Sequence, residues 1–421
     1  MDLRAVEEGL VDGCFKGMPG GIAAMPLSAV GARGWNLLAE DLPLPACVLK
    51  QSAIAHNEGL MRAFLDGAHA AISPHGKTTM APQLFARQLA GGAWAMTVGT
   101  VHQLQVARAF GCPRVVLANQ LVGRQGIRFV LDEMARDPAF EFYCLADSVA
   151  NVEQIAAAAR ARNVGRPINL FLEGGFVGGR TGCRSLAEAE TVARAVKAAE
   201  PHLSLRGVEG FEGLMGDPAQ VEAFLAYLCD IARMVDALEL AGAGPLILTA
   251  GGSAFYDLVA RHFGALNLRR PTRLLTRSGC YLTHDSAMYE DLYDGIAART
   301  GWAERPRPAI EVWAYVQSRP EPTRALVTMG KRDASWDHSW PKPLHWARPG
   351  DRAPRPMPAG HRITGMNDQH GYLDLPADSP LAVGDMVAFG ISHPCLTFDR
   401  WQLIHLVDDD YTVTGAIRTY F

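Results

Sequence analysis

Short apolar runs alternate with alanine-rich amphipathic stretches from about residue 46 to residue 290, and this alternation constrains the fold most strongly. Some of the apolar runs have the composition of strands that are buried on both faces: residues 115–118, 141–145, 168–172 and 246–249. Helical stretches lie between them, such as residues 149–162, preceded by the candidate caps Asp147 and Ser148, and residues 186–199. This pattern predicts a parallel α/β architecture.

The length of this region favours one closed barrel. About 245 residues suit a single (β/α)8 barrel, whose usual size is about 250 residues. A doubly wound open sheet is the alternative, but no GxGxxG motif opens a helix after the first predicted strand. We therefore predict the barrel.

The sequence changes character after about residue 300, where six of the eight tryptophans fall and helical periodicity fades. Residues 310–316 and 325–329 have the composition of strands, and the Pro- and Arg-rich residues 351–360 are typical of a loop. We predict a mostly antiparallel β domain here. The predicted segments are residues 1–45, part of which can complete the β domain, residues 46–295 for the barrel, and residues 296–421 for the β domain.

Composition excludes several classes of protein. The formal net charge is −4 and no basic stripe is present, so we expect no nucleic-acid partner. No apolar run approaches the ~18 residues that a membrane span requires. Acidic residues stand near the start, where a secretory signal has basic ones, and the eight cysteines form no CxxC pair. We therefore expect a cytoplasmic protein with reduced thiols.

Lys77 follows a short, mostly apolar stretch, residues 69–72, that stops at Ser73 and Pro74. This pattern predicts a strand that ends in a turn, with the lysine just past the carboxyl end of the strand. The reactive groups of a β/α barrel lie at that end. A lysine there can form a Schiff base with a carbonyl cofactor. A solvated lysine in a surface loop is the alternative.

His393 and Cys395 are separated by one residue in a stretch that has strand character. In an extended chain, residues i and i+2 project from the same face, so an imidazole and a thiolate would lie side by side. Both are ligands for a borderline-soft metal such as zinc, and two protein ligands leave positions open for water or substrate. The alternative is a chance pair on an edge strand, where Pro394 is tolerated.

Two glycine-bearing turns, residues 249–253 and 277–281, follow predicted strands late in the barrel. Small residues there let backbone N–H groups approach a phosphate, and phosphate sites are common at this place in barrels. Ordinary βα turns are the alternative. The glycine-rich residues 173–182 add Arg180, which either faces a cofactor ring or lies at the surface.

Together these residues resemble the D-serine dehydratase and D-threonine aldolase group of fold-type III pyridoxal-phosphate enzymes, which are relatives of alanine racemase. The resemblance spans roughly residues 44–421, and the lysine motif and the His-x-Cys pair are its most specific parts. It implies an alanine-racemase-like (β/α)8 barrel with a C-terminal β domain, and a homodimer with active sites near the domain and subunit interfaces. The matching segments are residues 74–78, 179–182, 251–253, 278–281, 367–371 and 393–395.

The resemblance also assigns roles to individual residues. Lys77 is implied to be the Schiff-base lysine of pyridoxal 5′-phosphate and the base at the substrate Cα, and Arg180 lies near the pyridine ring. His393 and Cys395 are implied to bind a divalent metal, for which zinc is expected and manganese is the alternative. The remaining candidate contacts to the cofactor are Gly251, Gly252, Ser253, Gly279, Cys280 and Tyr281.

The reaction implied by the resemblance is elimination of water from a D-3-hydroxy amino acid such as D-serine or D-threonine. The products are a 2-oxo acid and ammonia. Retro-aldol cleavage to glycine and an aldehyde is the alternative, but the group associates His-x-Cys with dehydratases and His-x-Asp with aldolases. Two departures bear on this choice. Phe211 stands where relatives often have tyrosine, and Asp217 stands near the place of the histidine proposed as the aldolase base.

Two other functions are disfavoured. An amino-acid racemase has no use for the metal. A non-catalytic protein that only binds the cofactor, like the barrel-only relatives, does not need the C-terminal domain and its metal pair.

Overall fold

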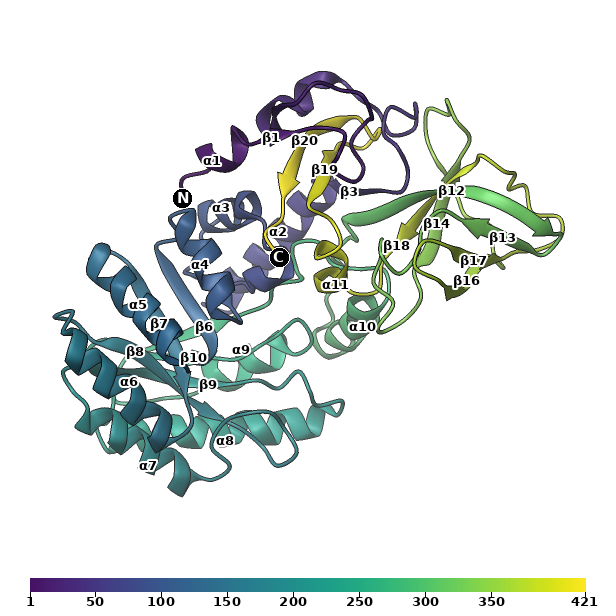
Figure 1. The fold of residues 1–421 in the computed structure, drawn as a ribbon. Coiled ribbons are helices and arrows are strands. Elements are labelled where there is room, and N and C mark those ends of the chain that lie inside the picture. Colours follow the sequence, from purple (N-terminus) through teal and green to yellow (C-terminus); the bar gives the residue numbers. More distant parts are fainter. The chain divides into compact units, whose positions relative to one another are not determined.

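The computed structural model describes residues 1–421 and divides them into two compact units (Figure 1). We refer to Arg62–Lys77 with Arg87–Gly279 as the barrel unit. Asp2–Met61, Thr78–Ala86 and Cys280–Phe421 form the sheet unit. The chain therefore passes between the units several times, instead of dividing once at residue 45 and once at residue 295.

The barrel unit contains eight parallel strands in the order β4-β11-β10-β9-β8-β7-β6-β5. Backbone hydrogen bonds from Trp94 N to Ile72 O and from Thr97 N to Pro74 O, both 2.8 Å, join β5 to β4 and close the barrel. The strands are β4 (Ala71–Ile72), β5 (Met96–Val98), β6 (Arg114–Gln120), β7 (Glu141–Ala146), β8 (Ile168–Gly174), β9 (Leu203–Gly210), β10 (Leu246–Thr249) and β11 (Thr272–Thr276).

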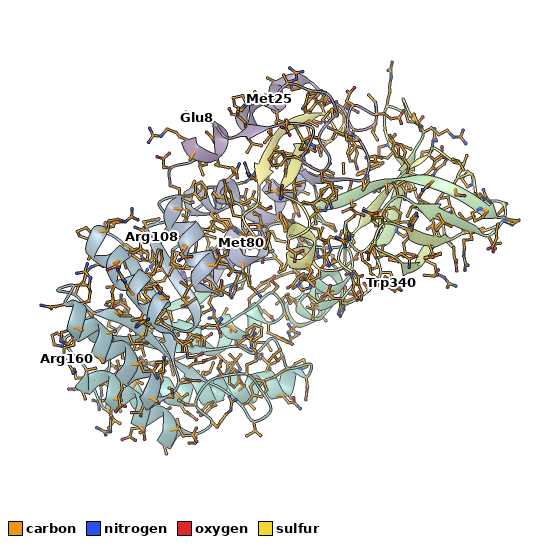
Figure 2. The ribbon with its side chains drawn as sticks, in the orientation of Figure 1. Glu8, Met25, Met80, Arg108, Arg160 and Trp340 are labelled. Atoms are coloured by element: carbon orange, nitrogen blue, oxygen red, sulfur yellow. The ribbon has the colours of Figure 1, made fainter.

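Amphipathic helices alternate with these strands and cover the barrel (Figure 1). Their starts agree with the sequence pattern: the Ser148 hydroxyl accepts the Asn151 N–H and caps α6, as predicted. Figure 2 shows Arg108 on α4, where its buried guanidinium donates to Glu133 at 2.9 Å and Asp137 at 2.7 Å. The helices are α4 (Val101–Ala109), α5 (Arg124–Arg136), α6 (Val149–Arg162), α7 (Leu186–Ala198), α8 (Pro218–Ala237) and α9 (Tyr256–Gly264).

Side chains fill the barrel, which is therefore a packed core and not a pore. The cluster contains Val116, Leu145, Phe171, Ile247 and Leu275, one each from five different strands. These residues point inward because side chains alternate along a strand. The predicted (β/α)8 barrel is confirmed.

The sheet unit is built on a ten-stranded sheet in which only β3 and β19 pair in parallel. β3 pairs with β12 and β19, so the stretch at which we predicted the barrel to begin belongs to this sheet. The predicted mostly antiparallel β domain is confirmed. The strands are β3 (Ala46–Lys50), β12 (Ile310–Glu321), β13 (Arg324–Val327), β14 (Lys342–Ala347), β15 (Arg355–Pro356), β16 (Arg362–Met366), β17 (Gly371–Asp374), β18 (Met386–Gly390), β19 (Leu403–Val407) and β20 (Val413–Arg418).

The N-terminal residues pack onto this sheet near its last strand. Leu37 N donates to Tyr411 O at 3.1 Å, and Val413 N donates to Trp35 O at 2.7 Å. The unit also contains the helix α10 (Met288–Thr300) and the short helix α11 (Pro394–Phe398), which includes Cys395. None of the helices is both long and apolar enough to cross a membrane.

Candidate active site

Lys77 lies on a single 3-10 turn, Gly76–Thr78, immediately after β4 and therefore at the carboxyl end of a barrel strand. Its side chain runs past Gly99, which follows β5: a Cβ built on that glycine would lie 3.9 Å from Lys77 Cδ. The side chain is exposed, and its ammonium makes no hydrogen bond or ion pair. A lysine so placed is free to react with a carbonyl group.

A buried ion pair lies at the same end of the barrel. Arg277, directly after β11, pairs with Glu209 near the end of β9, and its Nη2 also donates to Gly210 O at 3.2 Å. Both charged side chains are almost completely buried. Arg277 Nε and Nη1, Glu209 Oε2 and the nearby His75 Nδ1 have no hydrogen-bond partner. Unpaired buried polar atoms such as these mark a place where a polar ligand can bind.

The electrostatics of this cluster keep His75 neutral. Burial, together with the positive charges of Arg277, Lys77 and Arg180, lowers the pKa of His75 well below its usual value. Burial has the opposite effect on a carboxyl group and raises the pKa of Glu209 to about 7 despite the Arg277 guanidinium. The sequence alone assigned no role to His75, Glu209 or Arg277. The available signal was their position at or just past the carboxyl ends of barrel strands.

The two predicted glycine turns meet in the barrel unit. Ser278 Oγ donates to Gly252 O at 2.6 Å, and Arg277 N donates to Gly251 O at 3.0 Å. Gly251 has a φ of +90°, a backbone conformation that favours glycine. The backbone N–H groups of Gly251 and Gly252 both donate to the buried Glu212 carboxylate, at 3.1 and 3.0 Å.

This arrangement fits a phosphate. Two neighbouring backbone N–H groups converge on one anionic group, which is the arrangement that anion-binding turns present. Here the anion is the carboxylate of Glu212, which occupies the donors that a phosphate would need. The predicted roles of Ser253, Gly279 and Tyr281 stay predictions.

Arg180 lies over the ring of Phe211, with 4.4 Å between its guanidinium carbon and the ring centroid. The contact is a cation–π interaction at an exposed position. Phe211 therefore packs against Arg180 where relatives often have tyrosine, and the predicted position of Arg180 at a cofactor ring stays a prediction. Asp217 caps α8, since its carboxylate accepts the Ala219 N–H at 3.0 Å.

His393 and Cys395 lie in the sheet unit, but not on a strand. The prediction of an extended chain is wrong here, because Pro394 begins the short helix α11 and His393 is its N-cap residue. Proline is favoured at the first position of a helix, where its missing N–H costs nothing. The two side chains nevertheless influence each other: Cys395 raises the pKa of His393, and His393 lowers the pKa of Cys395.

Three further side chains complete this cluster. Cys280 Sγ lies 3.8 Å from Cys395 Sγ, and Thr78 Oγ1 lies 3.4 Å from Cys395 Sγ and 3.7 Å from Cys280 Sγ. Asp337 Oδ2 is 2.8 Å from His393 Nδ1. The Cys280 thiol, predicted to lie in a phosphate turn, thus contacts the predicted metal ligand. Its backbone contact to a phosphate stays a prediction.

The charges of this cluster are coupled. The hydrogen bond from Cys280, with the interaction with His393, outweighs burial and lowers the pKa of Cys395 well below its usual value. Burial lowers the pKa of His393, but Cys395 and Asp337 outweigh it and raise that pKa to about 9. The hydrogen bond to Cys395, with burial, raises the pKa of Cys280, which stays a thiol.

These residues fit a metal ion in their donor types. One imidazole and one thiolate are donors that zinc prefers, and the Asp337 carboxylate on Nδ1 is the usual partner of a metal-binding histidine. No group of three or more His, Cys, Asp or Glu side chains is arranged around one centre. The pair could therefore supply at most two of the positions around a metal.

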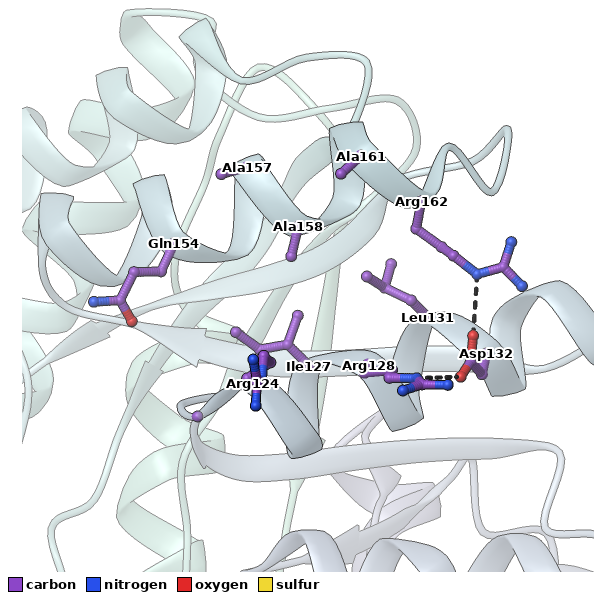
Figure 3. A pocket seen from close by; sticks show the side chains of 11 residues that line it. Arg124, Ile127, Arg128, Leu131, Asp132, Gln154, Ala157, Ala158, Ala161 and Arg162 are labelled. Atoms are coloured by element: carbon purple, nitrogen blue, oxygen red, sulfur yellow. Dashed lines mark hydrogen bonds and ion pairs between the residues drawn. The ribbon is translucent and has the colours of Figure 1, made fainter.

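A separate cavity of about 940 Å³ lies between α5 and α6 of the barrel unit (Figure 3). Alanine and other aliphatic residues line it, and Asp132 pairs there with Arg128 at 3.4 Å and Arg162 at 3.0 Å. Its lining contains no lysine, histidine or cysteine. It is therefore not a candidate for the chemistry of the residues above.

The part of the chain that contains His393 and Cys395 is similar to a known protein family. Residues 309–407 match the family model of the putative serine dehydratase domain. The matched segment runs from β12 to β19 and includes both His393 and Cys395. The predicted resemblance to the D-serine dehydratase and D-threonine aldolase group is confirmed.

Relatives extend the similarity beyond this matched segment. The 3-hydroxy-D-aspartate aldolase of Paracoccus denitrificans (strain Pd 1222) is 25% identical over 309 residues, which cover 72% of this chain and 75% of the relative.

Solved structures share the fold. The D-threonine aldolase of Filomicrobium marinum has a TM-score of 0.74 at 22% identity and covers 92% of this chain and 97% of its own. The D-threo-3-hydroxyaspartate dehydratase of Delftia sp. HT23 has a TM-score of 0.71 at 21% identity, with coverages of 91% and 99%. Alanine racemases have this fold too, which confirms the predicted alanine-racemase-like architecture.

Proposed function

We propose that this protein is a lyase that uses pyridoxal 5′-phosphate and a divalent metal to eliminate water from a D-3-hydroxy amino acid. The unsaturated amino acid that remains would then be hydrolysed, taking up one water, to a 2-oxo acid and ammonia. The observation that carries the proposal is the His393–Cys395 pair: its second residue is a cysteine, the type associated with dehydratases, where aldolases have an aspartate. Named relatives include a dehydratase of a D-3-hydroxy amino acid and support the class of reaction.

The barrel unit supplies the residues for the cofactor. Lys77 would bind the carbonyl carbon of pyridoxal phosphate covalently, and the N–H groups of Gly251 and Gly252 would donate hydrogen bonds to its phosphate. Bound there, pyridoxal phosphate would supply an electron sink for the electron pair that remains at the substrate Cα when its proton is removed. Once released by the substrate amine, Lys77 can accept the Cα proton, since nothing else engages its amine.

The sheet unit supplies the residues for the leaving group. A divalent metal on His393 and Cys395 would act as a Lewis acid on the substrate β-hydroxyl. Asp337 fixes the ring of His393 through Nδ1 and leaves its other nitrogen for the metal. Thr78, which contacts both thiols, directly follows Lys77 in the chain, and Cys280 directly follows Gly279. A residue proposed to bind the cofactor is therefore adjacent in the chain to a residue near the proposed metal ligands at two places.

Retro-aldol cleavage is the second candidate, because named relatives include two aldolases. It requires a base on the β-hydroxyl. Asp217, the residue nearest to the expected place of that base, caps α8 and is not an imidazole. This observation favours elimination.

Product analysis distinguishes the two reactions. Purified protein, loaded with pyridoxal phosphate and zinc, would be incubated with D-serine, D-threonine and D-3-hydroxyaspartate. Ammonia and a 2-oxo acid in equal amounts identify the dehydratase, and glycine with an aldehyde identifies the aldolase. We further propose a homodimer, which light scattering of the purified protein tests.

A further inference from the structure

The two sulfur atoms of Cys280 and Cys395 have a separation that suits a shared metal. They lie 3.8 Å apart. Two thiolates that bind one tetrahedral zinc, each at about 2.3 Å, lie about 3.8 Å from each other. A disulfide would require about 2.05 Å. The observed separation, which is also that of a sulfur hydrogen bond, is too long for a disulfide and equals the spacing of two sulfur ligands on one tetrahedral ion.

The surroundings of Cys280 support this role. The residue is buried, with 4% of its surface exposed, and its thiol faces Cys395 and the Thr78 hydroxyl instead of apolar side chains alone. His393, two residues before Cys395, has its Nδ1 engaged by Asp337 at 2.8 Å. Cys395 thus has a second thiol at 3.8 Å and an oriented imidazole two residues away in the chain.

We propose that Cys280 is a third protein ligand of the metal held by His393 and Cys395. The centre would have two thiolates, one imidazole and one open position for the substrate hydroxyl. This inference rests on the proposed function, because it assumes that metal. The three side chains are not arranged around one centre, so metal binding would have to bring them together.

The ligand set has a chemical consequence. Two thiolates with one imidazole match the donor sets of catalytic zinc, which keep one position open. Soft sulfur donors disfavour manganese and magnesium, which prefer oxygen ligands. Cys280 would therefore restrict the site to zinc and similar ions, and Cys280→Ser, with a hard oxygen in place of sulfur, should bind manganese better than the unaltered protein does.

Cobalt(II) measures the number of thiolates directly. In the full-length protein with pyridoxal phosphate bound and zinc replaced by cobalt, sulfur-to-cobalt charge transfer absorbs in the near ultraviolet and grows with each thiolate. We expect this absorption, per bound cobalt, to fall by about half in Cys280→Ser and by about half in Cys395→Ser. Cys47→Ser, which alters another fully buried cysteine of the sheet unit, is the matched control and should leave it unchanged.

The outcomes separate this inference from the proposed function. An unchanged absorption per cobalt in Cys280→Ser overturns the third ligand and leaves the metal on His393 and Cys395. Absence of any sulfur-to-cobalt absorption in the unaltered protein overturns both. X-ray absorption at the zinc edge needs no variant: two sulfur atoms at about 2.3 Å support the proposal, and one overturns it.

Discussion

Glu212 accepts a hydrogen bond from the backbone N–H of Gly251 at 3.1 Å, so a buried carboxylate occupies a donor that the cofactor phosphate is expected to use. The neighbouring N–H of Gly252 is held by the same carboxylate at 3.0 Å. An anion at this turn shows that the turn attracts negative charge. It also means that Glu212 and a phosphate compete for the same two groups.

The first prediction follows from this competition. Glu212→Gln removes the negative charge and weakens the hold on the two N–H groups, so pyridoxal phosphate should bind several-fold more tightly, a gain of about 1 kcal/mol. Absorbance titration of the cofactor-free protein measures this affinity. Glu153→Gln, at an exposed position of α6, serves as the control. Weaker binding in Glu212→Gln would show that the carboxylate orders the turn and does not compete.

The second prediction concerns Lys77. Borohydride should fix the cofactor to the peptide that contains Lys77, and mass spectrometry of the digested protein identifies that peptide. Lys77→Ala should lose the visible absorption of the lysine-bound cofactor and all turnover, because both the covalent anchor and the base at Cα are removed. Lys331→Ala, which alters a lysine of the sheet unit, should keep both. Labelling of another lysine would contradict the assignment.

The third prediction concerns the buried pair of Arg277 and Glu209. Arg277→Met leaves the Glu209 carboxyl buried without its partner, which should lower the free energy of unfolding by about 3–5 kcal/mol. Arg277→Met combined with Glu209→Gln should recover part of this loss, because no buried charge remains unpaired. Denaturant unfolding of the single and double variants measures the effect. Additive losses would show that the two side chains do not interact.

The fourth prediction is a pH dependence of stability that arises from His405. Its ring is buried, faces Gly17 O at 3.0 Å, and burial lowers its pKa to about 4. The unfolded chain, with a pKa near 6.5, binds the proton first as the pH falls. Stability should therefore fall between pH 6.5 and about pH 4, by about 3 kcal/mol for this residue.

Glutamine at this position tests the assignment, because its amide can donate to Gly17 O without titrating. The unfolding free energy of His405→Gln should depend less steeply on pH between 6.5 and 4 than that of the unaltered protein. His102→Gln, at an exposed position of α4, should leave the slope unchanged. Equal slopes in all three proteins would exclude His405 as the source.

Local sequence patterns predicted the framework well. Residues 168–172 are apolar enough to require burial on both faces, and they form β8 between two parallel neighbours. Ser148 caps α6 because a hydroxyl there satisfies a free N–H at the start of the helix. The same local reasoning was wrong at His393. The helix α11 begins at Pro394, and a proline at that place is compatible with an edge strand as well as with a first helical turn.

The contacts within the candidate site were harder to predict, because they join residues that are distant in the sequence. Cys280 and Cys395 are 115 positions apart, and Asp337 and His393 are 56 positions apart. Each pair meets only because the sheet unit folds as it does. Arg277 meets Glu209 because β11 and β9 both flank β10 in the barrel. No local spacing carries this information.

The metal requirement tests the central claim most directly. The account predicts that protein loaded with pyridoxal phosphate and zinc converts D-threonine to 2-oxobutanoate and ammonia in equal amounts. A chelator should abolish this conversion and leave the visible absorption of the Lys77-bound cofactor intact. Added zinc should restore the conversion. Conversion that persists in protein shown to be free of metal, or products that are glycine and acetaldehyde, would contradict metal-assisted elimination.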